Sequence, residues 1–118
     1  MPKVMIVDDD RTTVKLLQTL LELDGFDVSI AGRGGEVMDL ANKVNPDVIL
    51  MDYHLTDMDG VDVLRDLRAT PTFAKTPIVI ASGLNVEDEV MEAGANAFLV
   101  KPFEPDDLPK LFNKLMGA

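Results

Sequence analysis

Residues 4–10 read VMIVDDD, and residues 49–60 read ILMDYHLTDMDG. In both stretches a short apolar run is followed directly by aspartate. Strands buried on both faces have such continuous apolar runs, and they belong to parallel sheets. The two stretches therefore predict buried parallel strands that end in acidic side chains.

Three further apolar runs alternate with amphipathic stretches along the chain. Strands are predicted at residues 4–8, 28–31, 48–52, 78–81 and 97–100. Helices are predicted at residues 11–24, 35–44, 61–69, 86–93 and 105–116. Pro109 is expected to lie in the first turn of the last helix, which would then begin late. The regular alternation predicts a doubly wound α/β fold with a five-stranded parallel sheet and five helices.

The composition excludes several classes of protein. The chain has 118 residues, 47% of them apolar, and a net charge of −10. An acidic surface repels nucleic acid and anionic membranes, so nucleic-acid binding through this domain is not expected. The first apolar run is too short for a signal peptide or membrane insertion. The chain has no cysteine, which fits the cytoplasmic location that we expect.

Polar residues with complementary chemistry follow four of the predicted strands. The first strand ends in Asp8 and Asp9, the third in Asp52, the fourth near Ser82 and the fifth in Lys101. Clustered carboxylates repel one another, and a hard cation such as Mg²⁺ relieves that repulsion. An ammonium group and a hydroxyl suit the remaining oxygens of a phosphoryl group. This set favours phosphoryl transfer onto a carboxylate, which would form an aspartyl phosphate.

These stretches resemble the receiver domain of bacterial two-component response regulators of the chemotaxis-regulator type. The matching pieces are VMIVDDD, ILMDYHLTDMDG, PIVIASG and AFLVKPF, in the family's order and at nearly its spacing. The resemblance covers the whole chain and implies a flavodoxin-like sheet with strand order 2-1-3-4-5. It implies one receiver domain over residues 1–118, with no output domain. It also implies a signalling switch that catalyses only its own phosphorylation and dephosphorylation.

The resemblance assigns roles and partners. Asp52 would take the phosphoryl group from a histidine kinase or a phosphotransfer protein, and Lys101 would pair with that group. The Lys101–Pro102 peptide bond is expected to be cis. Magnesium would be bound by the carboxylates of Asp9 and Asp52, by the backbone carbonyl of His54 and, through a water molecule, by Asp8.

The resemblance also implies the response to phosphorylation. Ser82 would hydrogen-bond to the phosphoryl group while Phe98 changes rotamer. The fourth helix, fifth strand and fifth helix would then signal to a downstream protein that the sequence does not identify. His54 and Leu84 would flank the phosphoryl group and set its lifetime.

Two alternatives differ in chemistry. Residues 8–12 also read D-x-D-x-T, which resembles the nucleophile motif of haloacid-dehalogenase-type phosphatases, with Asp8 as nucleophile. The acidic motif that those enzymes need on a later strand is missing. A degenerate receiver that acts without phosphorylation is the other alternative, but Asp8, Asp9, Asp52, Ser82 and Lys101 are all present. Asp10 is better explained as a helix cap than as a metal ligand.

Several positions depart from the family's pattern. Thr56 stands where the family usually has proline, which predicts a less rigid loop. Residues 57–60 are interpreted as a turn feeding a helix. The stretch 82–93 is about one helical turn short of many relatives, which puts the fourth helix in doubt. Asn96 and Ala97 lie where dimerising receivers commonly have an acidic pair, so that dimer is not expected.

Overall fold

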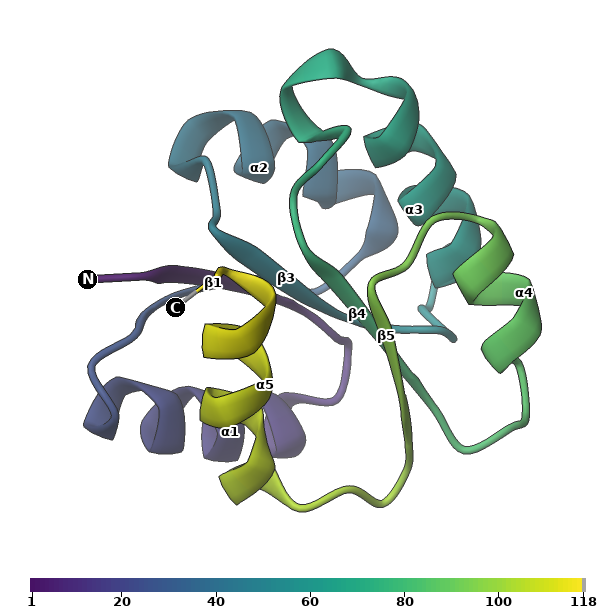
Figure 1. Cartoon of the computed structure of the whole chain (residues 1–118). Helices are drawn as coiled ribbons and strands as arrows, with labels where there is room; N and C mark the ends of the chain where they lie inside the picture. Colours follow the sequence, from purple (N-terminus) through teal and green to yellow (C-terminus); the bar gives the residue numbers. More distant parts are fainter. Residues whose placement is uncertain (118) are drawn as a thin grey trace.

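The sheet is parallel throughout and carries helices on both faces. The computed structural model describes residues 1–117, and its strands lie in the order β2-β1-β3-β4-β5 (Figure 1). This confirms the predicted order, and each strand lies within one residue of its predicted bounds. The strands are β1 (Lys3–Val7), β2 (Asp27–Ala31), β3 (Val48–Asp52), β4 (Ile78–Ser82) and β5 (Ala97–Val100).

Five α-helices connect and flank the strands, as predicted. They are α1 (Arg11–Leu23), α2 (Val37–Val44), α3 (Gly60–Ala69), α4 (Glu87–Glu92) and α5 (Leu108–Leu115). Short 3₁₀ turns precede α2 and α5, so both helices begin later than predicted. Pro109 lies in the first turn of α5, which confirms the late start. The fourth helix exists, but it has only six residues.

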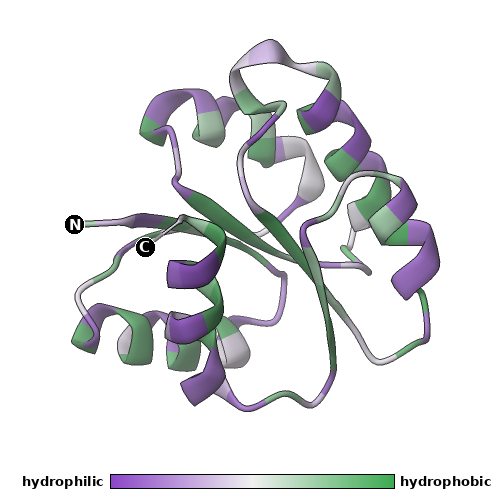
Figure 2. Cartoon of the chain, in the orientation of Figure 1, coloured by the Kyte–Doolittle hydropathy of each residue, from purple (hydrophilic) through white to green (hydrophobic). Residues whose placement is uncertain are grey.

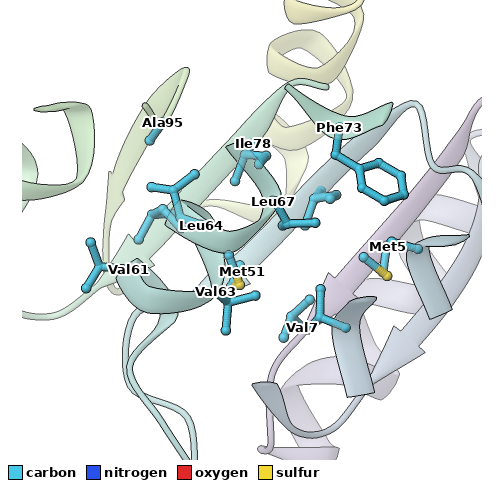
Figure 3. Packing of buried hydrophobic residues seen from close by; sticks show 14 of the residues in the cluster. Met5, Val7, Met51, Val61, Val63, Leu64, Leu67, Phe73, Ile78 and Ala95 are labelled. Carbon is cyan, nitrogen blue, oxygen red and sulfur yellow. The ribbon is translucent and has the colours of Figure 1, made fainter. Parts of the chain in front are cut away.

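The core has two parts, one on each face of the sheet. The helices α1 and α5 cover one face, and α2, α3 and α4 cover the other (Figure 1). The central strands are hydrophobic along most of their length (Figure 2). Leu64 and Leu67 of α3 pack over sheet residues such as Met51 (Figure 3). Burial of both sheet faces explains why the strand sequences are continuously apolar.

The last helix packs its aromatic residue into the core. Phe112 is fully buried, and its ring contacts Phe26 edge to face with the centroids 5.9 Å apart. Met116 packs against the same core cluster, whereas Met91 of α4 is exposed. No helix within residues 1–117 is long and apolar enough to cross a membrane.

A half-buried arginine joins the segments around α3, which the sequence did not suggest. The Arg68 guanidinium donates hydrogen bonds to the backbone carbonyls of Gly94, Phe73 and Thr76 at 2.8–2.9 Å. It also donates to the side chain of Asn96 at 2.7 Å. Asn96 therefore has a structural role here. Burial lowers the pKa of Arg68 from its ordinary value.

Candidate functional site

Three carboxylates meet where β1 and β3 end. The two strands pair in register, and they deliver Asp8, Asp9 and Asp52 to the same edge of the sheet. One oxygen from each side chain lies within 4.8 Å of the others. Asp8 is buried, Asp52 is half-buried and Asp9 is exposed. Oxygen ligands in this arrangement could hold a hard divalent cation.

A lysine from the end of β5 reaches this cluster. The Lys101 Nζ lies 3.1 Å from Oδ1 of Asp52 and 3.7 Å from Oδ2 of Asp8. Its backbone N–H donates to the Ser82 carbonyl at 2.9 Å, which joins the end of β5 to the end of β4. The Lys101–Pro102 peptide bond is cis, as expected. Within residues 1–117, Lys101 is the cation paired with this cluster.

The negative charges of the three carboxylates are only partly compensated within the cluster. Burial raises the pKa of the Asp8 carboxyl, and the charges of Asp52 and Asp9 raise it further. The backbone N–H of Asp10, which donates to Asp8 Oδ1 at 2.9 Å, and Lys101 act in the opposite direction on this pKa. One ammonium group does not neutralise three carboxylates, so a further cation would be stabilised here.

Asp10 serves α1 and lies outside the cluster. Its Oδ1 accepts hydrogen bonds from the backbone N–H groups of Thr12 at 3.1 Å and Thr13 at 3.4 Å. Its Oδ2 accepts from the Thr13 hydroxyl at 2.9 Å. The Thr13 hydroxyl and N–H bonds lower the pKa of Asp10. These bonds confirm that Asp10 caps the helix.

Ser82, Leu84 and His54 lie in segments near the same edge, whereas Phe98 lies within β5. Ser82 is buried at the end of β4, and its Oγ accepts from the Leu84 N–H at 3.0 Å. Leu84 is 58% exposed. Phe98 is half-buried and packs against the core cluster beneath α3 and α4. His54 is exposed, and its ring lies edge-on to that of Tyr53 with the centroids 4.7 Å apart.

Two side chains of the loop after β3 hold the site in place, and the sequence did not predict this role. The Thr56 hydroxyl donates a hydrogen bond to Oδ2 of Asp9. The Asp57 carboxylate accepts from the backbone N–H groups of Gly34 and Gly35, both at 2.9 Å. The expectation of a looser loop overlooked these anchors. No local sequence signal could reveal them, because their partners lie 22 to 47 positions away.

The start of α3 and the helix α4 also make contacts beside Asp52. A Cβ on Gly60 would collide with the backbone carbonyl oxygen of Asp52, so the close approach of α3 requires glycine. The Tyr53 hydroxyl donates to the carboxylate of Glu89 on α4. This bond, together with burial, raises the pKa of Tyr53 to about 12. Tyr53 thereby links the residue after Asp52 to α4.

A cleft of about 520 Å³ opens beside Asp8 and Asp9. Its walls come from α1 and from the loop after β2, and they include the cations Arg11, Lys15 and Arg33. The cluster is therefore accessible from the side of α1.

The fold and this edge define the class of protein, a doubly wound α/β domain with an acidic site at its strand ends. Residues 4–113 match the family model described as the response regulator receiver domain. The chain therefore belongs to the response regulator receiver domain family of two-component systems. This assignment does not support the phosphatase alternative.

Curated relatives and solved structures agree with the family. The chain is 35% identical over 109 residues to the cell cycle transcriptional regulator CtrA of Caulobacter vibrioides. It is 33% identical over 109 residues to the DNA-binding response regulator MtrA of Mycobacterium tuberculosis. Each match covers 90% of this chain and 46% of the relative, so the chain spans about half the length of these relatives.

Three solved structures share the fold over nearly the whole chain. The receiver domain of the Francisella response regulator 1452 has a TM-score of 0.92 at 33% identity, covering 99% of this chain and 98% of that one. The chemotaxis response regulator CheY4 of Vibrio cholerae has a TM-score of 0.90 at 30% identity, covering 98% of each chain. The receiver domain of the sensor histidine kinase PA1611 of Pseudomonas aeruginosa has a TM-score of 0.89 at 26% identity, covering 99% and 98%. That last structure has a magnesium ion coordinated in its active site cleft.

Proposed function

We propose that this domain is a Mg²⁺-dependent switch that accepts a phosphoryl group on Asp52. The observation that carries the proposal is the placement of Asp52, which pairs with Lys101 at 3.1 Å and has oxygens of Asp8 and Asp9 within 4.8 Å. Asp52 thus has a cation on one side and potential metal ligands on the other. A nucleophilic carboxylate needs both to approach an anionic donor.

The residues of the cluster suit Mg²⁺. Asp9, Asp52 and the backbone carbonyl of His54 would hold the ion directly, and Asp8 would hold it through water. The donors are all oxygens, and the buried Asp8 carboxylate gains most from a neighbouring positive charge because burial raises its pKa. When bound, the ion would neutralise charge on the phosphoryl oxygens.

Asp52 would act as the nucleophile. Its carboxylate oxygen forms a bond to phosphorus while the bond between phosphorus and the donor's histidine nitrogen breaks, and the electron pair stays on that nitrogen. The donor would be a histidine kinase or a phosphotransfer protein. Lys101 stays beside Asp52 and stabilises the charge on the transferred group.

The phosphoryl group would then change the bonding of Ser82, whose Oγ now accepts from the Leu84 N–H. The Ser82 hydroxyl would donate to a phosphoryl oxygen, a charge-assisted bond of about 1.5–3 kcal/mol. That energy is enough to change which of two conformations dominates. Phe98 would turn inward, and the face formed by α4, β5 and α5 would signal to a downstream protein.

Labelling with a small phosphodonor tests the proposal. Wild-type chain should incorporate close to one phosphoryl group per molecule with Mg²⁺ and none with EDTA. Asp52→Asn should incorporate none, while the control Asp66→Asn, an exposed change on α3, should behave as wild type. Equal incorporation by the Asp52→Asn variant, or no incorporation by wild type, would refute the proposal. The second result would favour a receiver that acts without phosphorylation.

A further inference from the structure

We propose that Thr56 is a positioning residue that holds the Asp9 carboxylate ready for the metal ion, and that Asp57 anchors Thr56. The inference rests on the proposed Mg²⁺ site and adds a chain-specific determinant of its affinity. It follows from two hydrogen-bonded contacts of the loop after β3 that the phosphoryl-transfer chemistry does not itself require.

The first contact selects an orientation of Asp9. This side chain is exposed, so without a partner it would exchange among rotamers, and ordering it would cost free energy each time the metal binds. The Thr56 hydroxyl donates to Oδ2 of Asp9. A carboxylate has several acceptor sites, so Oδ1 stays available to a cation. The hydroxyl therefore orders the ligand before the metal arrives.

The second contact fixes Thr56 itself. The adjacent Asp57 accepts two hydrogen bonds of 2.9 Å, from the backbone N–H groups of Gly34 and Gly35. These bonds join the loop after β3 to the loop that follows β2. Because β1 lies between β2 and β3, the joined loops enclose the end of β1 that carries Asp9.

Other features of the two loops fit this anchor. The hydrogen bonds from Gly35 and Gly34 lower the pKa of the Asp57 carboxyl, so the anchor is charged at neutral pH. A Cβ on Gly34 would collide with the side chain of Met58, so glycine allows the loops to approach. Thr56 stands where the family usually has proline. Here the hydrogen bonds between the two loops restrain the backbone that a proline would otherwise restrict.

Hydrogen-bond partners of metal ligands commonly change metal affinity by about 10–100-fold when they are removed. Calorimetric titration of the full chain with MgCl₂ tests this effect directly. Thr56→Val keeps the shape of the side chain and removes the hydroxyl, and we expect it to raise the Kd for Mg²⁺ by about 10-fold or more. Thr56→Ser restores the hydroxyl and should bind within about 3-fold of wild type. Asp57→Asn keeps only one acceptor oxygen, and its Kd for Mg²⁺ should lie between those of Thr56→Val and Thr56→Ser.

Thr56 and Asp57 are both exposed, so these variants should keep the fold, and urea unfolding in EDTA checks that they do. Equal or tighter Mg²⁺ binding by Thr56→Val would overturn the inference, because the hydroxyl would then be neutral or would compete with the ion. Loss of affinity in Thr56→Ser as large as in Thr56→Val would also overturn it. Wild-type chain that fails to bind Mg²⁺ would refute the proposed function itself, which distinguishes the two failures.

Discussion

Replacing Asp8 by asparagine should stabilise the domain in the absence of metal and weaken its stabilisation by Mg²⁺. Asp8 is the buried member of the cluster, and burial raises its pKa above the ordinary value of 3.8. At neutral pH its charge therefore opposes folding. Asparagine has nearly the same shape and keeps the oxygen that accepts from the Asp10 N–H at 2.9 Å.

The size of the effect depends on the burial of Asp8, which is the largest cause of its raised pKa, and on the charges around it. At an effective dielectric constant near 20, unit charges 4.8 Å apart repel by about 3.5 kcal/mol, and oxygens of Asp9 and Asp52 both lie within that distance of an Asp8 oxygen. The attraction to Lys101 across 3.7 Å is about 4.5 kcal/mol on the same scale. Repulsion exceeds attraction, but solvent screens the exposed Asp9. We expect Asp8→Asn to raise the free energy of unfolding by about 1–2 kcal/mol, or the Tm by about 4–8 °C.

The pH dependence has a definite sign. A carboxyl whose pKa is raised on folding costs stability as the pH rises through that folded pKa. The advantage of Asp8→Asn should therefore grow as the pH rises above 3.8, be full above the folded pKa, and vanish below 3.8, where Asp8 is protonated in both states.

Urea unfolding of wild type and Asp8→Asn, in EDTA and in Mg²⁺, measures all of these effects. Mg²⁺ at 100 times its Kd should stabilise wild type by about 2.7 kcal/mol and the variant by much less. Asp66→Asn, an exposed change on α3, is the control and should differ from wild type by less than about 0.5 kcal/mol. An Asp8→Asn chain that is less stable than wild type in EDTA would refute the electrostatic reasoning.

Three further predictions concern the surroundings of the site. Gly60→Ala should cost about 1–3 kcal/mol in urea unfolding, because its Cβ would collide with the Asp52 carbonyl; an unchanged midpoint would contradict this. Tyr53→Phe removes the bond to Glu89 and should speed hydrogen exchange in α4, whereas unaltered exchange there would show that the bond does not hold the helix. His54→Ala should speed dephosphorylation with little pH dependence between pH 6 and 8, if the imidazole screens the phosphoryl group from water. Slower hydrolysis, with loss of a pH step near neutrality, would show that His54 assists the water instead.

The sequence predicted the architecture because the fold depends on patterns that recur locally. Continuous apolar runs located each strand to within one residue, and the strict alternation of strands and helices determined the class of fold. The cap at Asp10 was predicted for the same reason, since its partners Thr12 and Thr13 are close in sequence. The convergence of the acidic residues followed from the rule that parallel strands end at one edge.

The supports of the site were not predictable in this way. The hydrogen bonds of Thr56 to Asp9 and of Tyr53 to Glu89 join positions 47 and 36 residues apart. They depend on the detailed course of loops, which carries no periodic signal. The resemblance to receiver domains named the reacting groups, whereas their hydrogen-bonded surroundings became visible only in three dimensions.

Asp52 is the proposed nucleophile, and peptide mapping of the phosphorylated chain identifies the residue that accepts the phosphoryl group. The chain is incubated with Mg²⁺ and a small phosphodonor, the acyl phosphate is trapped by borohydride reduction, and the modified residue is located by mass spectrometry. We expect modification at Asp52 alone, and none when Mg²⁺ is removed. Modification at Asp8 would contradict it, because the adjacent carboxylate would then be the nucleophile of a different reaction.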